Sequence, residues 1–282
     1  MPPPNLPRPA RWTGAQNRPP GLPLPPAPMP MLSGFALLKT WRYVAVFGEE
    51  FSFYAGTARV GPIPQEFWAV WDRRAGRMYE QTNLIPRVVK FPPRQMLVED
   101  GGVRFNIALE EDEGFEVATP YGDAYTWTRK QLIPARGQVT FAGRTHEVEA
   151  RAFIDDNAGY HPRRTIWKWC GGVGRDTAGR EVGWNAIVGL NDTAEASENC
   201  VWVDGVAQFV GAVTFAEDLS SVTFAAGGAL HFKQEATRKQ NDEFLIIHSY
   251  YEQPIGTFTG TLPGGITLAS AYGVMERQDA LW

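Results

Sequence analysis

The sequence predicts an all-β protein built from antiparallel strands. From Phe35 onward, short runs rich in Val, Phe, Tyr, Trp and Thr are separated by Gly, Pro, Asp and Asn at the intervals of strand-turn-strand proteins. Several of the intervening dipeptides tolerate the positive φ angles of hairpin turns. The sequence has no long apolar stripe with a 3.6-residue period, and this disfavours a helical fold.

Five hairpins can be placed along the chain, because each of their turns lies between two runs with strand character. In chain order the turns are Ala75-Gly76, Ala142-Gly143, Ala178-Gly179, Asp204-Gly205 and Gly227-Gly228. The best candidates for short helices are Pro134–Gly137 and the last few residues of the chain.

The strands are expected to form two units that follow a proline-rich arm. Residues 1–33 contain many prolines and no periodic apolar pattern, which predicts an extended, poorly ordered arm. A β chain of this length has many sheet edges to protect, and barrels or packed sheets are the usual solution. We therefore expect successive β-barrel units over residues 34–150 and 151–282, with a boundary near residue 150.

Composition excludes several classes of partner. The 282 residues are 44% hydrophobic, enough for a large core, and the formal charge of −4 gives no basic patch for nucleic acid. No run approaches the 18 or more apolar residues of a membrane span, and the first residues lack the apolar core of an export signal. We expect a soluble, cytoplasmic protein without a transmembrane segment. Nothing in the sequence indicates its oligomeric state.

The sequence also indicates no cofactor and no metal. Cys170 and Cys200 lack the spacing of zinc or redox motifs, and the four histidines include no pair at ligand spacing. There is no phosphate-binding P-loop, no G-x-G-x-x-G dinucleotide motif and no G-x-S-x-G elbow. If the protein is an enzyme, it works without a bound nucleotide and without an obvious covalent nucleophile.

One segment, DDNAGYHPRRTIWKW at residues 155–169, concentrates polar and aromatic side chains. On a strand, Trp167 and Trp169 point to one face and form a wall, either of the core or of an apolar pocket. Asp155 and Asp156 point to opposite faces, so they cannot share a proton and at most one faces the interior. There, burial would raise the pKa of an aspartate and make it a proton donor. Alternatively, both aspartates cap the turn NAGYHP.

The loop residues of this segment leave further alternatives open. Arg163 and Arg164 diverge, and one of them could pair with Asp155 or Asp156, which would lower the pKa of that carboxyl. His161 precedes Pro162, so its backbone is extended, and its ring could orient a carboxylate or contact a ligand. The alternative for His161 is a solvated or simply hydrogen-bonded ring.

Residues further along the chain complete the candidate site. Asn185, if it faces the interior, is either a structural tie or a ligand contact. Glu276 lies late in the final strand, where a buried salt bridge with an arginine is the structural alternative. The candidate catalytic residues are therefore Asp155, Asp156 and His161. The candidate ligand-binding residues are Tyr160, Arg163, Arg164, Trp167, Trp169, Asn185, Glu198, Trp202 and Glu276.

Four motifs resemble, in the right order, the bacterial domain of unknown function 2804 family: residues 155–169, GREVGWN at 179–185, ENCVWVDG at 198–205 and YGVMERQDALW at 272–282. More distantly, an acid, a glycine, W-x-W and a D-G or G-R hairpin are similar to the AttH and carotenoid 1,2-hydratase group. That likeness implies two consecutive lipocalin-like (calycin) β-barrels, closed or partly open, that enclose an apolar ligand. It also implies that Asp155 or Asp156 is the counterpart of an acid that protonates an isoprenoid alkene.

Three hypotheses about function follow. The first is binding of a hydrophobic small molecule, such as a lipid or isoprenoid, in a Trp-lined pocket. The second is a cofactor-independent hydratase (a lyase), cyclase or isomerase, with an aspartate as proton donor and indole rings that stabilise a cation. The third is a carbohydrate-binding or carbohydrate-cleaving β-protein, which predicts an exposed Trp platform and two carboxylates roughly 5 to 10 Å apart.

Overall fold

The computed structural model of the protein describes residues 8–244 and 247–281, and in these residues the chain is almost entirely β. Apart from one 3-10 turn, η1 (Ala15–Asn17), the described elements are strands, and every described strand pair is antiparallel. Across the described ranges, no helix reaches the length and apolarity needed to cross a membrane. The predicted all-β fold is confirmed.

The first sheet contains the strands up to residue 159, apart from the two short strands within residues 32–37, which form a separate pair. Its main path runs β7-β6-β5-β4-β13-β12-β10-β9-β8, with β11 on β12 beside β10, and β1 on β11. Its strands are β1 (Ala10–Trp12), β4 (Lys39–Val46), β5 (Phe51–Val60), β6 (Ile63–Asp72), β7 (Arg77–Asn83), β8 (Val89–Lys90), β9 (Gln95–Asp100), β10 (Val103–Leu109), β11 (Phe115–Tyr121), β12 (Ala124–Phe141) and β13 (Arg144–Gly159).

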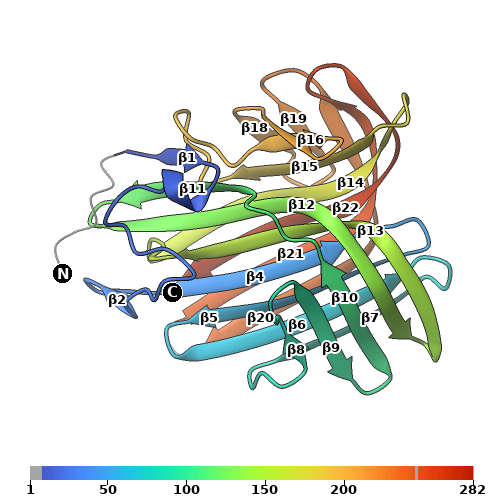
Figure 1. Ribbon diagram of the computed structural model, residues 1–282, viewed down its shortest axis with the longest axis horizontal. Coiled ribbons are helices and arrows are strands. Elements are labelled where there is room, and N and C mark those ends of the chain that lie inside the picture. Colours follow the sequence, from blue (N-terminus) through green and yellow to red (C-terminus); the bar gives the residue numbers. More distant parts are fainter. Residues whose placement is uncertain (1–7, 245–246, 282) are drawn as a thin grey trace.

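The second sheet contains the strands from residue 164 onward, in the order β17-β16-β15-β14-β22-β21-β20-β19-β18. Its strands are β14 (Arg164–Asp176), β15 (Glu181–Val188), β16 (Cys200–Val203), β17 (Val206–Phe209), β18 (Val213–Phe215), β19 (Ser221–Phe224), β20 (Ala229–Phe244), β21 (Ile247–Leu262) and β22 (Ile266–Leu281). Both sheets are open, curled half-barrels that lie against each other (Figure 1).

The chain passes from the first sheet to the second at residues 160–163. This passage falls after the predicted boundary near residue 150, because β13 continues its pairing with β4 and β12 as far as Gly159. Asp155 and Asp156 therefore lie inside a strand, and the alternative in which both cap a turn is wrong. Their carboxyl groups point to opposite faces of β13, as the strand period predicts.

The five predicted hairpin turns all connect paired strands, namely β6 to β7, β12 to β13, β14 to β15, β16 to β17 and β19 to β20. At Ala142-Gly143 the φ angles are 50° and 74°, and at Asp204-Gly205 they are 48° and 83°. Two positive φ angles in a two-residue loop match the twist of the flanking strands.

The two helix candidates are wrong, since Pro134–Gly137 lies in β12 and the last described residues lie in β22. β12 has two successive partners on one edge: β11 as far as Lys130, and β10 from Ala135. Pro134 falls between these two partners, where its missing N–H costs no hydrogen bond to a neighbouring strand. Local sequence alone gives no sign of this change of partner.

Alternation along the strands produces three apolar layers. Val44 and Val46 belong to the cluster on the concave face of the first sheet, whereas Tyr43 and Ala45 belong to a cluster shared by both sheets. A third cluster, which includes Trp184, fills the second half-barrel. Because the shared cluster lies between two sheets, polar side chains at this level are shielded from water on both sides.

The N-terminal arm is ordered over residues 8–33, where the sequence predicts a poorly ordered segment. Trp12, Leu22 and Leu24 are buried in a fourth cluster, against Trp127 and neighbouring side chains of the first sheet. A two-residue hairpin, β2 (Leu32–Ser33) with β3 (Ala36–Leu37), ends the arm. The few apolar residues of the arm are too widely spaced to form a recognisable strand or helix pattern, but each one has a specific contact.

Candidate functional site

A group of polar side chains lies within the apolar layer between the two sheets. Strand alternation places them there: Tyr43 is two residues from the shared-core residue Ala45, and Glu276 is two residues from Val274. Electrostatic coupling links the tyrosines to Glu276 across the layer. We call this group the inter-sheet site. It consists of Tyr43 on β4, Tyr54 on β5, Trp167 on β14, Tyr251 and Gln253 on β21, and Glu276 on β22.

Glu276 is the ionisable centre of the inter-sheet site. Trp167 Nε1 donates to Glu276 Oε1 at 2.7 Å, and Gln253 Nε2 donates to Glu276 Oε2 at 2.8 Å. Burial raises the pKa of Glu276 to about 7, despite the opposing effect of these hydrogen bonds. The predicted alternative of a salt bridge between Glu276 and an arginine is not found among the described residues.

Three buried polar atoms beside Glu276 lack partners within the described residues: Tyr43 Oη, Tyr54 Oη and Gln253 Oε1. Burial raises the pKa of both tyrosines, so both hydroxyls are neutral donors at neutral pH. An unsatisfied buried polar group costs about 1–3 kcal/mol. All three of these atoms belong to the inter-sheet site that contains the Glu276 carboxyl.

Arg238 on β20 lies at another side of the inter-sheet site. Its guanidinium lies 4.8 Å from the ring centroid of Phe67 and 5.3 Å from that of Tyr251. It also forms an ion pair with Glu80 on β7, with 3.2 Å between Nε and Oε2. Arg238 is therefore positioned by side chains of both sheets, and it supplies a fixed positive charge near the two tyrosines of the first sheet.

A second polar network lies deeper between the sheets, around Lys130 on β12. Lys130 Nζ lies 2.6 Å from Asp155 Oδ1 and 3.0 Å from Glu198 Oε1. Burial alone would lower the pKa of Lys130, but the two carboxylates raise it, so the ammonium group stays charged. Burial raises the pKa of Glu198. This arrangement holds the Asp155 carboxylate in an ion pair.

Asn185 and Trp169 extend this network into the second sheet. Trp169 Nε1 donates to Asn185 Oδ1 at 2.8 Å, and Asn185 Nδ2 donates to the backbone oxygen of Glu198 at 2.9 Å. Gly171 makes room for the Trp169 ring, because a Cβ at this glycine would lie 2.6 Å from Trp169 Cζ2. Trp167 and Trp169 thus share one face, as predicted, but their indole N–H groups serve different networks.

Asp156 lies on the concave face of the first sheet, away from the inter-sheet site. It pairs with Arg42 at 3.0 Å and with Arg129 at 2.7 Å. The positively charged side chains that pair with Asp155 and Asp156 thus come from neighbouring strands of the same sheet. Arg164 instead pairs with Asp279 at an exposed position.

His161 is buried beside the inter-sheet site rather than solvated. Its ring centroid lies 5.1 Å from that of Trp41, and Trp41 stacks on Trp167 at 5.9 Å. Burial, together with the nearby Lys39, lowers the pKa of His161 to about 3, so the ring is neutral at physiological pH. Within the described residues neither ring nitrogen makes a hydrogen bond to another side chain.

The remaining predicted residues lie outside the inter-sheet site. Tyr160 packs in the cluster of the N-terminal arm, and its hydroxyl donates to the backbone oxygen of Pro30 at 2.7 Å. Trp202 packs against Phe115 and Phe153 in the shared core. Arg163 is an exposed residue of the link between the two sheets.

Sequence reasoning missed most of the inter-sheet site. Tyr43 and Tyr54 belong to strands of the first sheet, which meet Trp167 and Glu276 only when the two sheets pack. Tyr251, Gln253 and Arg238 come from β21 and β20 of the second sheet, and strand pairing brings them toward Glu276. The one available signal is a polar residue in the alternating position of a strand whose neighbours are apolar, as at Gln253, two residues before Ile255. That signal marks a polar residue in a buried layer, but it does not identify the partner.

Two curled antiparallel sheets with a buried acid between them define the class of this protein, a two-unit, lipocalin-like β-protein. Residues 86–282 match the model of the family described as domain of unknown function (DUF2804), and the chain belongs to this family. The motifs of residues 155–282 predict this membership, which is confirmed. No curated protein matches the sequence significantly.

Two solved structures share the fold over most of their length. A protein from Nitrosomonas europaea, described provisionally as AttH, is 12% identical, with a TM-score of 0.54 over 90% of this chain and 97% of its own. Kievitone hydratase from Nectria haematococca is 8% identical, with a TM-score of 0.50 over 86% of this chain and 88% of its own. At these identities the likeness is one of fold, and it agrees with the predicted lipocalin-like architecture.

Proposed function

We propose that this protein binds a small, largely apolar molecule between its two sheets and that the carboxyl group of Glu276 transfers a proton to and from it. The observation that carries the proposal is the setting of Glu276, a buried acid with a pKa of about 7 that is held by Trp167 and Gln253. A general acid works best when its pKa lies near the working pH, because both protonation states are then populated.

The surroundings of Glu276 support an apolar substrate that carries one or a few oxygen atoms. Aromatic side chains form most of the nearby wall, while the hydroxyls of Tyr43 and Tyr54 are donors without protein acceptors among the described residues. Apolar pockets with a few converging polar groups are typical small-molecule sites. A substrate oxygen that accepts from the two phenols would be held at a fixed distance from the carboxyl group.

The proposed chemistry is protonation of a carbon–carbon double bond. The Glu276 carboxyl gives its proton to one alkene carbon, which leaves a carbocation on the substrate and a carboxylate on the enzyme. Water then adds to the cation and its surplus proton returns to the carboxylate, which completes hydration. Loss of a proton from a neighbouring carbon to the carboxylate instead completes isomerisation. Indole faces near the site, such as that of Trp167, favour a cation.

Glu276 is a better candidate for the proton donor than the two aspartates. Asp155 is paired with the buried Lys130, and Asp156 with Arg42 and Arg129. Ion pairs thus occupy both of these carboxyl groups, whereas Glu276 has no cationic partner among the described residues. The role of proton donor therefore stays an untested prediction for Asp155 and Asp156, and we assign it to Glu276 in the proposed mechanism.

The carbohydrate alternative has less support. It predicts tryptophans on a shallow exposed platform, whereas the exposed fractions of Trp167 and Trp169 are 9% and 4%. Stacking on a sugar ring requires an open indole face, and these two faces are covered by the opposite sheet.

The proposal is tested by hydrogen exchange at substrate carbon. Molecules that co-purify with the protein from its own host are identified by native mass spectrometry, extracted and incubated with the protein in deuterium oxide. We expect the protein to introduce deuterium at a carbon position, and we expect Glu276→Gln to slow this exchange about a hundredfold or more, because glutamine keeps the shape but cannot transfer the proton.

The matched control is Glu99→Gln, because the Glu99 side chain is 78% exposed and lies far from the inter-sheet site, on β9. It should exchange at the wild-type rate. Equal exchange by wild type and Glu276→Gln would overturn the assignment of Glu276. If a molecule binds to the wild-type protein but takes up no deuterium, the protein binds this molecule without catalysing proton transfer to it. If Asp155→Asn slowed deuterium uptake more than Glu276→Gln does, the aspartate would be the proton donor instead of Glu276.

A further inference from the structure

A cavity of about 600 Å³ lies on the concave face of the first sheet, on the opposite side of the sheet from Glu276. Its wall includes Arg42, Asp156 and Ala158, which share the face of the apolar residues Val44 and Ile154. Pro25 and Pro26 of the N-terminal arm form part of its lining. This volume is within the range of sites for drug-sized molecules, roughly 300–1,000 Å³.

The polar lining of this cavity is cationic. Arg42 and Arg129 share the Asp156 carboxylate, and Arg42 also pairs with Glu111 at 2.7 Å. Arg42 Nε is buried and has no hydrogen-bond partner within the described residues. Arg59 also lines the cavity, and none of the ion pairs found in the described part of the chain includes it. The lining therefore has an unpaired cation, Arg59, beside an arginine whose buried Nε has no partner among the described residues.

Strand register brings these two arginines together. Arg42 pairs with Thr57 and Thr40 pairs with Arg59 across β4 and β5. Arg42 and Arg59 are thus diagonal neighbours on the same face, with Cβ atoms about 7–8 Å apart or less. Two arginine side chains at that spacing can both reach one carboxylate.

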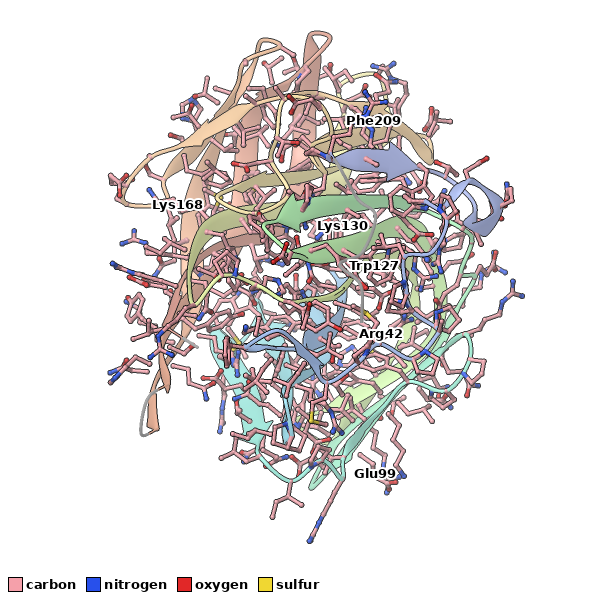
Figure 2. All side chains as sticks on the ribbon, turned by 90° about the vertical axis from the view of Figure 1, so that its left-hand side faces the viewer. Arg42, Glu99, Trp127, Lys130, Lys168 and Phe209 are labelled. Atoms are coloured by element: carbon pink, nitrogen blue, oxygen red, sulfur yellow. The ribbon has the colours of Figure 1, made fainter. Side chains whose placement is uncertain are left out.

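The rest of the lining is mostly apolar, with Thr40, Thr57, Gln65 and Asn157 as neutral polar residues, and it suits the apolar part of a ligand. Trp127 is buried at the level of Ala158, its pairing partner on β13. Figure 2 shows Trp127 and Arg42 near each other, where the N-terminal arm crosses this face of the molecule. The other apolar lining residues are Pro25, Pro26, Trp41, Ala58, Pro64 and Pro86.

We propose that this cavity is a second ligand site, for a small carboxylate that carries an aromatic or short alkyl body. The carboxylate binds Arg59 beside Arg42, and the body lies against Trp127 and the prolines of the arm. This inference does not depend on the proposed chemistry at Glu276, because the two sites lie on opposite faces of the first sheet.

The test is isothermal titration of the full chain with 4-phenylbutyrate and with its neutral counterpart 4-phenylbutanol. We expect the carboxylate to bind more tightly than the alcohol. Arg59→Ala should weaken carboxylate binding about tenfold to a hundredfold, as expected for loss of a charge-assisted hydrogen bond. Arg59 is exposed, so its substitution leaves the fold intact, whereas Arg42 holds the ion pairs of Asp156 and Glu111.

Two controls make the result specific. Arg104→Ala removes an exposed arginine of β10, 68% accessible, that does not line the cavity, and should bind as wild type does. Glu276→Gln should also bind as wild type does, since it alters only the inter-sheet site. Equal binding of the acid and the alcohol, unchanged binding by Arg59→Ala, or loss of binding in Glu276→Gln would each overturn the proposal.

Discussion

At the scale of single residues, Glu276 acquires its properties from the sheet that faces it as much as from its own strand. Val274 and Trp167 belong to the same apolar layer as Tyr43 of the first sheet, so the carboxyl is covered on both sides. Burial raises its pKa to about 7, and the side chains of Trp167 and Gln253 that donate hydrogen bonds to it are neutral. An arginine in place of Gln253 would favour the carboxylate and remove the acid.

The raised pKa of Glu276 predicts a pH dependence of stability. An acid that is harder to ionise in the folded state stabilises the fold below the unfolded pKa of 4.5 and loses that contribution as the pH rises to about 7. The difference corresponds to about 3 kcal/mol. We expect Glu276→Gln to lose this dependence, so that its free energy of unfolding in urea, relative to wild type, increases between pH 4.5 and 7. A constant difference over this range would contradict the raised pKa.

His161 predicts the opposite dependence in a lower range. Its pKa is lowered by burial from 6.5 to about 3, so the neutral ring stabilises the fold above pH 6.5 and this contribution is lost as the pH falls toward 3. Comparing His161→Phe with wild type by urea unfolding between pH 6.5 and 4 should show a smaller loss of stability in the variant. An equal loss would mean that the ring is not buried in its neutral form.

Some residues of the site could be predicted from sequence and others could not. The period of a strand places Trp167 and Trp169 on one face and separates Asp155 from Asp156. It cannot show that Tyr43, more than a hundred residues earlier, faces Glu276, because that contact depends on how the sheets pack. For the same reason the sequence does not show that the two aspartates pair with basic side chains of β4 and β12, while Arg164 pairs with Asp279.

At the scale of elements, hairpins were predictable because their turn chemistry is local, as at Asp204-Gly205. The N-terminal arm was not, because its order depends on single contacts with distant strands. Arg18 pairs with Glu116 on β11, and Tyr125 donates to the backbone oxygen of Pro23. The exposed edge of β11 also gains a partner in β1, which protects that edge from other chains.

These contacts predict that the arm can be released by one substitution. Leu24 is 2% exposed in the cluster of the arm, and truncation of a buried leucine costs about 2–5 kcal/mol. We expect Leu24→Ala to expose the arm, so that trypsin cleaves after Arg11, which precedes Trp12, much faster than in wild type. Phe35→Ala is the control, because Phe35 is fully exposed. Equal resistance of Leu24→Ala and wild type would show that the sheet does not hold the arm in this way.

At the scale of the whole molecule, the two half-barrels are joined by a shared apolar layer rather than by a linker. Both sheets contribute to the inter-sheet site, Tyr43 and Tyr54 from the first and the other four residues from the second. The region that matches the family model begins at residue 86, after the strands that carry Tyr43 and Tyr54. Sequence composition predicts two β units, but the face on which they meet is fixed by packing over many residues.

The central claim is that the packing of the two sheets makes Glu276 a proton donor at neutral pH. The most direct measurement is a pH titration of its carboxyl carbon by carbon-13 NMR of the full chain, with the signal assigned by its absence in Glu276→Gln. We predict a midpoint near pH 7. A midpoint near the ordinary value of 4.5 would contradict the claim, because the group would then be a carboxylate throughout the physiological range.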